Sequence, residues 1–141
     1  MIGPTAYFHR TYDETMTLLI EARNYALYHD PIDQRTLTPA ARLAVSFEAL
    51  RVTSRLAQVM AWLLAQKAVH AGELSPEEGA GEEYALSGGA VCSDPDGPEN
   101  LALPTGLRSL LERSYSLYTR VHRLDEQVRR NSYQSAAGFG A

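Results

Sequence analysis

Cys92 is the side chain in this sequence that is best suited to covalent chemistry, and it lies in the segment "GGAVCSDPDG". A cysteine nucleophile requires a base such as histidine, which the fold would have to bring close, and the sequence offers no spacing that indicates such a pair. The four histidines of the chain, His9, His29, His70 and His122, are scattered and form no HExxH motif, and a single cysteine cannot form a CxxC motif. Those motifs are the usual signatures of zinc sites. We therefore predict no catalytic residue and no metal site.

The segment "CSDPDGPEN" contains part of the pattern of a calcium-binding loop. Asp94, Asp96 and Gly97 match D-x-[DN]-x-[DN]-G-x5-E. Cys92 then stands at the first aspartate and Leu103 at the glutamate, and neither side chain supplies an oxygen ligand. The segment is better interpreted as a plain turn. Because no convincing strand leads into a glycine-rich phosphate loop either, we predict a protein without enzymatic activity and without a cofactor.

The basic side chains near the end of the sequence could instead bind nucleic acid. Glu112, Asp125 and Glu126 interleave with them, however, and the whole chain carries a net charge of −4. Binding to nucleic acid depends on an excess of positive charge, so ion pairs at spacings of three and four along a helix explain more of the pattern. A small helical nucleic-acid-associated regulator remains the alternative function. The arginines concerned are Arg108, Arg113, Arg120, Arg123, Arg129 and Arg130.

Three helices must position these side chains, and each has recognisable ends. Thr11 and Glu14 form a capping-box pattern at the start of the first helix, which "HDPID" ends. Thr38 is an N-cap followed by Pro39 at the first helical position, and Gly72 stops the second helix. We predict an all-α, three-helix bundle with a long central helix. The predicted helices span residues 12–29, 39–71 and 105–131.

The connection between the second and third helices, residues 72–104, is strongly acidic. It contains eight Asp or Glu residues and no Lys or Arg, so it carries a charge of −8 and the rest of the chain carries +4. Such a Gly- and Pro-rich segment is typical of a largely solvated loop, some of which packs or forms a turn of helix near "SPEEGAGEEY". The closing residues "SYQSAAGFGA" are small and polar. We therefore expect one domain, residues 1–131, followed by a flexible tail, residues 132–141.

The second predicted helix has two apolar stripes, which is more apolar surface than one packing face requires. Both stripes keep the alternating spacing of four and three residues that is typical of a helix face. The third helix has one such stripe, in which Ser114 is the polar member. Either both stripes of the second helix lie in the core, or one of them binds a second copy in a two-fold dimer. The first stripe is Leu43, Phe47, Leu50, Ser54, Ala57, Ala61, Leu64 and Ala68; the second, our candidate dimer interface, is Val45, Ala49, Val52, Leu56, Val59 and Leu63.

Three segments of the chain resemble one known family. They are "FHRTYDETMTLLIEARNYAL", "FEALRVTSRLAQVMAWLLAQKAVHAGELS" and "LRSLLERSYSLYTRVHRLDEQV", within roughly residues 8–130. Together they are similar to the alphaproteobacterial regulator of CtrA degradation (RcdA) family. The resemblance implies a three-helix bundle that forms a homodimer and has a mobile C-terminal tail. It also implies a cell-cycle adaptor that helps the ClpXP protease degrade the master regulator CtrA, together with a CpdR-like response regulator and a PopA-like cyclic-di-GMP receptor.

The end of the chain is the predicted place of partner binding. A flexible segment that carries basic and aromatic residues can bind by becoming ordered on contact. "RRNSYQSAAGFGA" has this composition, and arginines of the preceding helix extend its positive charge. The candidate partner-binding residues are Arg120, Arg123, Arg129, Arg130, Tyr133 and Phe139.

The sequence also indicates a compartment. No apolar run is long enough to span a membrane, and the first residues lack the layout of a signal peptide. The lone cysteine cannot form a disulfide within the chain. We therefore expect a cytoplasmic protein.

Overall fold

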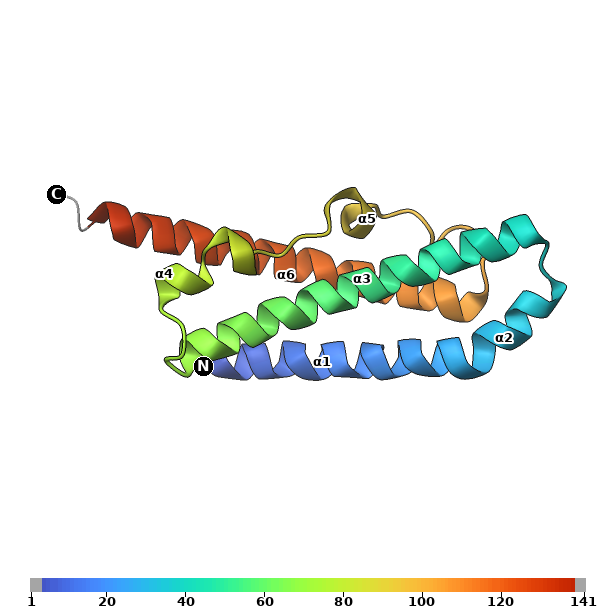
Figure 1. The fold of residues 1–141 in the computed structure, drawn as a ribbon, viewed down its shortest axis with the longest axis horizontal. Coiled ribbons are helices and arrows are strands. Elements are labelled where there is room, and N and C mark those ends of the chain that lie inside the picture. Colours follow the sequence, from blue (N-terminus) through green and yellow to red (C-terminus); the bar gives the residue numbers. More distant parts are fainter. Residues whose placement is uncertain (1–3, 139–141) are drawn as a thin grey trace.

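Three long helices lie side by side and form an all-α bundle (Figure 1). They are α1 (Pro4–Asn24), α3 (Pro39–His70) and α6 (Thr105–Gly138), and each of them contacts the other two. The computed structural model describes the backbone of residues 4–138 and the side chains of residues 7–134, and this part of the chain contains no strand. The predicted all-α fold with three main helices is confirmed. No helix within the same residues combines the length and apolar character that crossing a membrane requires.

α1 begins at Pro4, well before the predicted start at residue 12. Thr11 is a buried residue inside the helix, where its hydroxyl donates a hydrogen bond to the carbonyl oxygen of Tyr7 (3.1 Å). Glu14 forms an ion pair with α6. The capping-box prediction was wrong because a threonine inside a helix can bond to the carbonyl four residues before it, so its type alone does not distinguish a cap from a helix interior.

The helical path also continues beyond the predicted end at residue 29. A π-helical turn (Tyr25–His29) leads into α2 (Asp30–Asp33) and then into a 3-10 turn (Gln34–Thr36). Pro31, in the first turn of α2, lacks a backbone N–H and would clash with a regular helical turn before it. The wider π-helical turn accommodates the proline. The segment "HDPID" therefore redirects the helical path, at the bend labelled α2 in Figure 1, instead of ending it.

Both ends of α3 agree with the prediction for the second helix. The hydroxyl oxygen of Thr38 accepts a hydrogen bond from the N–H of Ala41 (3.2 Å), and Pro39 lies in the first turn. After His70 the chain turns at Gly72, whose φ of +78° is a left-handed conformation that favours glycine. Local signals therefore define the ends of this 32-residue helix.

The two apolar stripes of α3 have opposite environments. Within the second stripe, Val52, Leu56 and Val59 are at most 2% exposed, and Trp62 lies beside them in the same core. The prediction that the second stripe forms a dimer interface was therefore wrong, because this stripe is the core of the single chain. The stripes begin two residues apart, and two residues turn a helix by about 200°, so burying one stripe exposes the other. The residues corrected in this way are Val45, Ala49, Val52, Leu56, Val59 and Leu63.

The apolar stripe predicted on the third helix also faces the core. Leu117 and Val121 of α6 are fully buried. Ser114, the polar member of the stripe, is buried as well, and its hydroxyl oxygen accepts a hydrogen bond from Arg55 of α3 (3.2 Å). The serine is therefore a specific partner for a buried charge.

α6 ends later than predicted. The helix continues past residue 131 to Gly138, so residues 132–138 of the predicted tail are helical. Residues 139–141 lie outside the described residues. The flexibility of this end stays a prediction.

The acidic segment, residues 72–104, packs against the long helices. It contains α4 (Pro76–Gly79), a 3-10 turn (Glu82–Tyr84) and α5 (Gly89–Ser93), and α5 contacts both α3 and α6. Most of its acidic side chains are exposed, as expected of a solvated loop. Three of its apolar residues are buried, so this part of the segment packs instead of lying in solvent, whereas Val91 and Leu101 are exposed. Leu86, Cys92 and Leu103 are all part of the hydrophobic core.

The helical turn predicted near "SPEEGAGEEY" is present as α4. Ser75 accepts a hydrogen bond from the N–H of Glu78 (3.0 Å), and the Glu78 carboxylate accepts one from the N–H of Ser75 (3.4 Å). This capping box starts the short helix.

Candidate interaction site

Arg55 is a charged side chain at the centre of the molecule, and it fastens the acidic segment to the long helices. It is 1% exposed. Its guanidinium donates to the carbonyl oxygens of Cys92 (2.9 Å) and Asp94 (2.6 Å) in the acidic segment and of Leu111 (3.0 Å) in α6. The ring of Tyr115 lies 5.2 Å from the guanidinium carbon. Burial lowers the pKa of Arg55, and these carbonyl dipoles and the aromatic face stabilise its charge.

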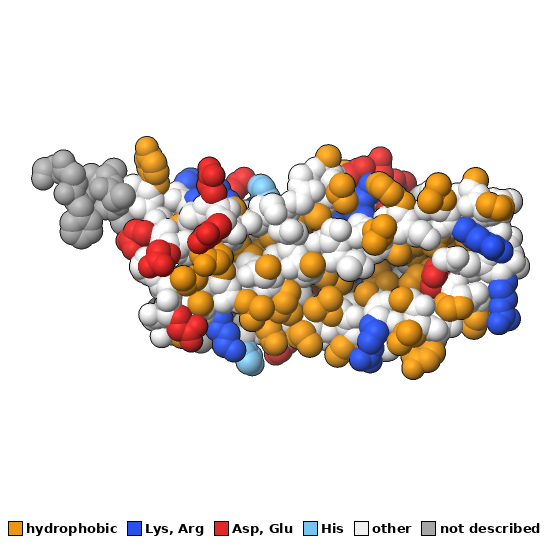
Figure 2. Space-filling model, viewed as in Figure 1, with side chains coloured by type: hydrophobic (Ala, Val, Ile, Leu, Met, Phe, Trp, Pro, Cys, Tyr) orange, Lys and Arg blue, Asp and Glu red, His pale blue; other side chains and the backbone are white. Residues whose placement is uncertain are grey.

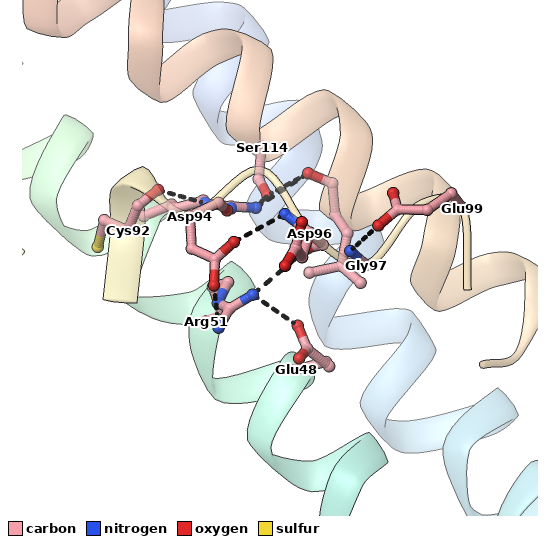
Figure 3. A network of polar contacts seen from close by, with 10 residues as sticks. Glu48, Arg51, Cys92, Asp94, Asp96, Gly97, Glu99 and Ser114 are labelled. Carbon is pink, nitrogen blue, oxygen red and sulfur yellow. Dashed lines mark hydrogen bonds and ion pairs between the residues drawn. The ribbon is translucent and has the colours of Figure 1, made fainter. Parts of the chain in front are cut away.

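Arg51 lies one helical turn before Arg55 and holds the same segment (Figure 3). Its guanidinium is 3.2 Å from the Glu48 carboxylate and 3.4 Å from the Asp94 carboxylate, and it donates to the carbonyl oxygen of Asp96 (3.3 Å). The N–H of Asp96 in turn donates to Oδ1 of Asp94 (2.9 Å). The plain turn predicted for "CSDPDGPEN" is present at residues 97–100, whereas Cys92 and Ser93 belong to α5, and Arg51 fixes the position of this segment on α3.

Cys92 is enclosed beside this network and has no exposed surface. Burial raises the pKa of its thiol, and the Arg55 charge opposes this shift without reversing it. The reactive thiolate is therefore disfavoured at neutral pH. In the described residues, no three His, Cys, Asp or Glu side chains are grouped so that they could hold a metal ion. The residues around Cys92 serve to position the acidic segment.

The outer surface of α3 carries the first apolar stripe, and its large side chains are exposed. Leu43 is 74% exposed, Leu50 64%, Phe47 52% and Leu64 51%. Figure 2 shows hydrophobic side chains spread along α1 and α3 on the viewed face. Apolar surface that gathers in this way marks sites of interaction with other molecules. We call Leu43, Phe47, Leu50 and Leu64 the outer stripe.

Several arginines of α6 are held by acidic partners. Arg113 and Arg120 form ion pairs with Glu21 and Glu14 of α1, and the hydrogen bond to Glu14 raises the pKa of Arg120. Arg129 lies 3.3 Å from the carboxylate of the aspartate four residues before it. Only the Arg129 pair lies within one helix at a spacing of four residues, as the sequence predicted, whereas the other two pairs join α6 to α1. The pairs neutralise part of the positive charge that binding to nucleic acid would require.

The candidate partner-binding residues do not form one surface. Arg129, Arg130 and Tyr133 line a shallow depression near the end of α6, and Tyr133 is 81% exposed. Arg123 is exposed on an earlier turn of the same helix. Phe139 lies outside the described residues. The structure therefore brings together three of the predicted residues.

A protein-family model described as "Protein of unknown function (DUF1465)" matches residues 4–138. The chain belongs to this family. It is similar to the crystal structure of RcdA from Caulobacter crescentus CB15, with 38% sequence identity and a TM-score of 0.68, over 86% of this chain and 89% of that chain. No curated protein matches the chain. The resemblance seen in the sequence is therefore confirmed, and the bundle of this DUF1465 protein is an RcdA-like fold.

Arg51 and Arg55 are the residues of this DUF1465 protein that sequence analysis missed. Their spacing of four places both on one face of α3, beside the buried stripe, and this pattern was the available signal. Arginines at such spacing are usually solvent-exposed. The burial of Arg55 depends on carbonyl oxygens of Cys92 and Leu111, which lie 37 and 56 residues further along the chain, and Arg51 donates to that of Asp96, 45 residues away.

Proposed function

We propose that this protein is a non-enzymatic adaptor of cell-cycle proteolysis, which helps the ClpXP protease degrade a CtrA-like transcription regulator. The observation that carries the proposal is the 38% identity to RcdA over 86% of the chain. A shared fold alone does not determine function. The proposal therefore rests on identity along the sequence together with the shared bundle.

The surfaces of the molecule support protein binding. The outer stripe presents large apolar side chains, which are suited to the centre of a protein–protein interface. The end of α6 presents arginines and an exposed tyrosine at a distinct place. An adaptor must bind more than one protein, and the proposed partners are ClpXP, a CpdR-like response regulator, a PopA-like cyclic-di-GMP receptor and the CtrA-like cargo.

The proposal includes a homodimer, which we place on the first part of the outer stripe, away from Leu64. A two-fold interface pairs the same surface on both copies, so it needs one self-complementary apolar patch. Leu43, Phe47 and Leu50 lie at spacings of four and three on one helix and are all more than half exposed. Covering them removes the apolar surface that the single chain leaves in water.

A reconstituted degradation reaction tests the proposed function. It contains purified ClpXP, the CpdR-like and PopA-like proteins, cyclic-di-GMP and a CtrA-like substrate, with and without this protein. We expect the protein to accelerate loss of the substrate, and to leave unchanged the degradation of a ClpXP substrate that requires no adaptor. Equal rates of CtrA loss in its presence and absence would contradict the proposal.

A further inference from the structure

A cavity of about 210 Å³ lies between the first part of α1 and the last turns of α3. Phe8 and Tyr12 of α1 line one side, and Leu63 and Leu64 line the other. Leu63 is buried in the core and Leu64 belongs to the outer stripe. The cavity is therefore an apolar depression at one end of the exposed face of α3.

Aromatic contacts hold the walls of this cavity in place. The ring of Phe8 lies 5.8 Å from the ring of Trp62 in the core and 5.1 Å from the ring of His70. Packed rings of this kind have few alternative positions, so the cavity is formed before any ligand binds. A preformed site loses less conformational entropy on binding than a flexible one.

The mouth of the cavity is basic. Lys67, His9 and His70 line it, all three are exposed, and its described lining contains no acidic side chain. His9 lies 3.9 Å from the Asp13 carboxylate, whereas Lys67 has no ion-pair partner in the described part of the chain. A bound group that combines an apolar part with a negative charge therefore complements both the interior and the mouth.

The size of the cavity distinguishes between kinds of occupant. Sites for drug-sized ligands and cofactors usually measure roughly 300–1,000 Å³. This cavity is smaller, at about 210 Å³, and suits one large apolar side chain. Single side chains inserted into such pockets anchor many protein–protein interfaces.

We propose that this cavity docks a segment of a partner protein that presents one leucine or phenylalanine beside acidic residues. The apolar side chain enters between Phe8 and Leu64, and the neighbouring carboxylate meets Lys67. This inference rests on the proposed function, because it takes the occupant to be a protein. It adds where that protein binds and which of its side chains are recognised.

Short synthetic peptides test the inference on the protein alone. The probe is a peptide with a central phenylalanine between glutamates, added at millimolar concentration to ¹⁵N-labelled protein. We expect amide shifts that cluster at Leu64, Lys67 and His70 and that saturate. Matched peptides with alanine in place of phenylalanine, or with lysines in place of glutamates, should bind at least about tenfold more weakly.

Two exposed positions allow variants that keep the fold. Leu64→Ser removes part of the apolar wall, and Lys67→Glu reverses the charge at the mouth, so each should weaken the peptide about tenfold. Leu101→Ser and Arg35→Glu are the controls, because both residues are exposed and neither lines the cavity. The controls should bind the peptide as the wild type does.

Any of three binding results would overturn the inference. They are no saturable shifts at the cavity, equal binding of the glutamate and lysine peptides, or unchanged binding in both cavity variants. A loss of dimer in Lys67→Glu, seen by light scattering, would also overturn it, because a second copy would then be the occupant. None of these measurements involves proteolysis, so their failure leaves the adaptor proposal standing, and failure of the degradation reaction leaves the peptide result standing.

Discussion

Arg55 shows how one residue can organise a whole segment. Its guanidinium binds carbonyl oxygens that belong to two elements, and no carboxylate takes part in those hydrogen bonds. Buried carbonyl oxygens that lose their donor are costly, since each unsatisfied polar group lowers stability by about 1–3 kcal/mol. The stability of the fold should therefore depend strongly on this side chain.

The first prediction concerns Arg55→Ala. We expect the free energy of unfolding to fall by at least about 3 kcal/mol, because several buried carbonyl oxygens lose their donor together. Arg55→Lys should recover only part of the loss, since one ammonium cannot reach all of them. Urea denaturation followed by circular dichroism measures the change.

Arg123→Ala is the control for Arg55→Ala, because it removes an exposed arginine and should change stability by less than about 0.5 kcal/mol. Equal effects at the two positions would show that Arg55 does not fasten the segment.

The second prediction concerns alkaline pH. Burial raises the pKa of Tyr118 and of the Cys92 thiol above their ordinary values of 10.0 and 9.0. The unfolded chain therefore releases these protons at lower pH than the folded chain, so stability is fully present below pH 9 and falls as pH rises above it. Tyr118→Phe should reduce the slope above pH 10, although it also removes the hydrogen bond to the carbonyl oxygen of Ser87 (2.9 Å). Urea denaturation at a series of pH values measures the slope. If stability fell with pH as steeply in Tyr118→Phe as in the wild type, the pH dependence would not come from Tyr118.

Among the elements, α3 separates two surfaces with different roles. Val52 and Leu50 are two residues apart in sequence, yet they are 2% and 64% exposed.

The third prediction uses this difference in exposure between Val52 and Leu50. Val52→Asp should unfold the protein, because it buries an unpaired charge in the core. Leu50→Asp should keep the helical circular dichroism spectrum and convert a dimer to a monomer in light scattering. A dimer that persists in Leu50→Asp would move the interface away from the outer stripe.

The fourth prediction concerns the last turns of α6. Truncation after Arg130 removes Tyr133, which is 81% exposed, and among residues 131–134, whose side chains the structure describes, none belongs to the hydrophobic core. We expect nearly unchanged melting temperature together with weaker capture of partners from cell extract. A truncated protein that supports CtrA degradation at the full rate would exclude a role for this end. Arg123→Ala, in the intact chain, tests whether an exposed charge earlier on α6 contributes.

Local signals predicted the parts of the fold that depend on neighbouring residues. Thr38 and Gly72 defined both ends of α3 because capping and left-handed φ involve only adjacent backbone. Which stripe of α3 is buried could not be predicted, since both stripes are apolar. The position of Arg55 depends on carbonyl oxygens far along the chain. The cavity at Lys67 likewise requires two helices to be placed side by side.

At the scale of the whole molecule, polar contacts join the acidic segment to the bundle in addition to the apolar core. The long helices are held mainly by that core, whereas the acidic segment combines a few core residues with the polar contacts of Arg51 and Arg55. The segment can therefore be loosened while the helices stay packed. Cys92 reports such loosening because its thiol has no exposed surface.

The fifth prediction uses that thiol. Cys92 should react slowly with a thiol reagent in the native protein and rapidly after denaturation. Arg51→Ala should increase the native rate about tenfold or more, because loss of the contacts to Asp94 and Asp96 makes local opening easier. Arg42→Ala, on the first turns of α3, is the control and should leave the rate unchanged. An equal rate in Arg51→Ala and wild type would show that Arg51 does not limit opening.

The hydrogen bonds of Arg55 to the acidic segment end on main-chain oxygen atoms, and this has an evolutionary consequence. Every amino acid has the same main-chain carbonyl, so substitutions around Cys92 leave these bonds intact as long as the turn is kept. Surface side chains of residues 72–104, apart from Asp94, which pairs with Arg51, are thus free to diverge between related proteins, while the arginine on α3 is constrained. Lineages can acquire new surface specificity in this segment without rebuilding the bundle beneath it.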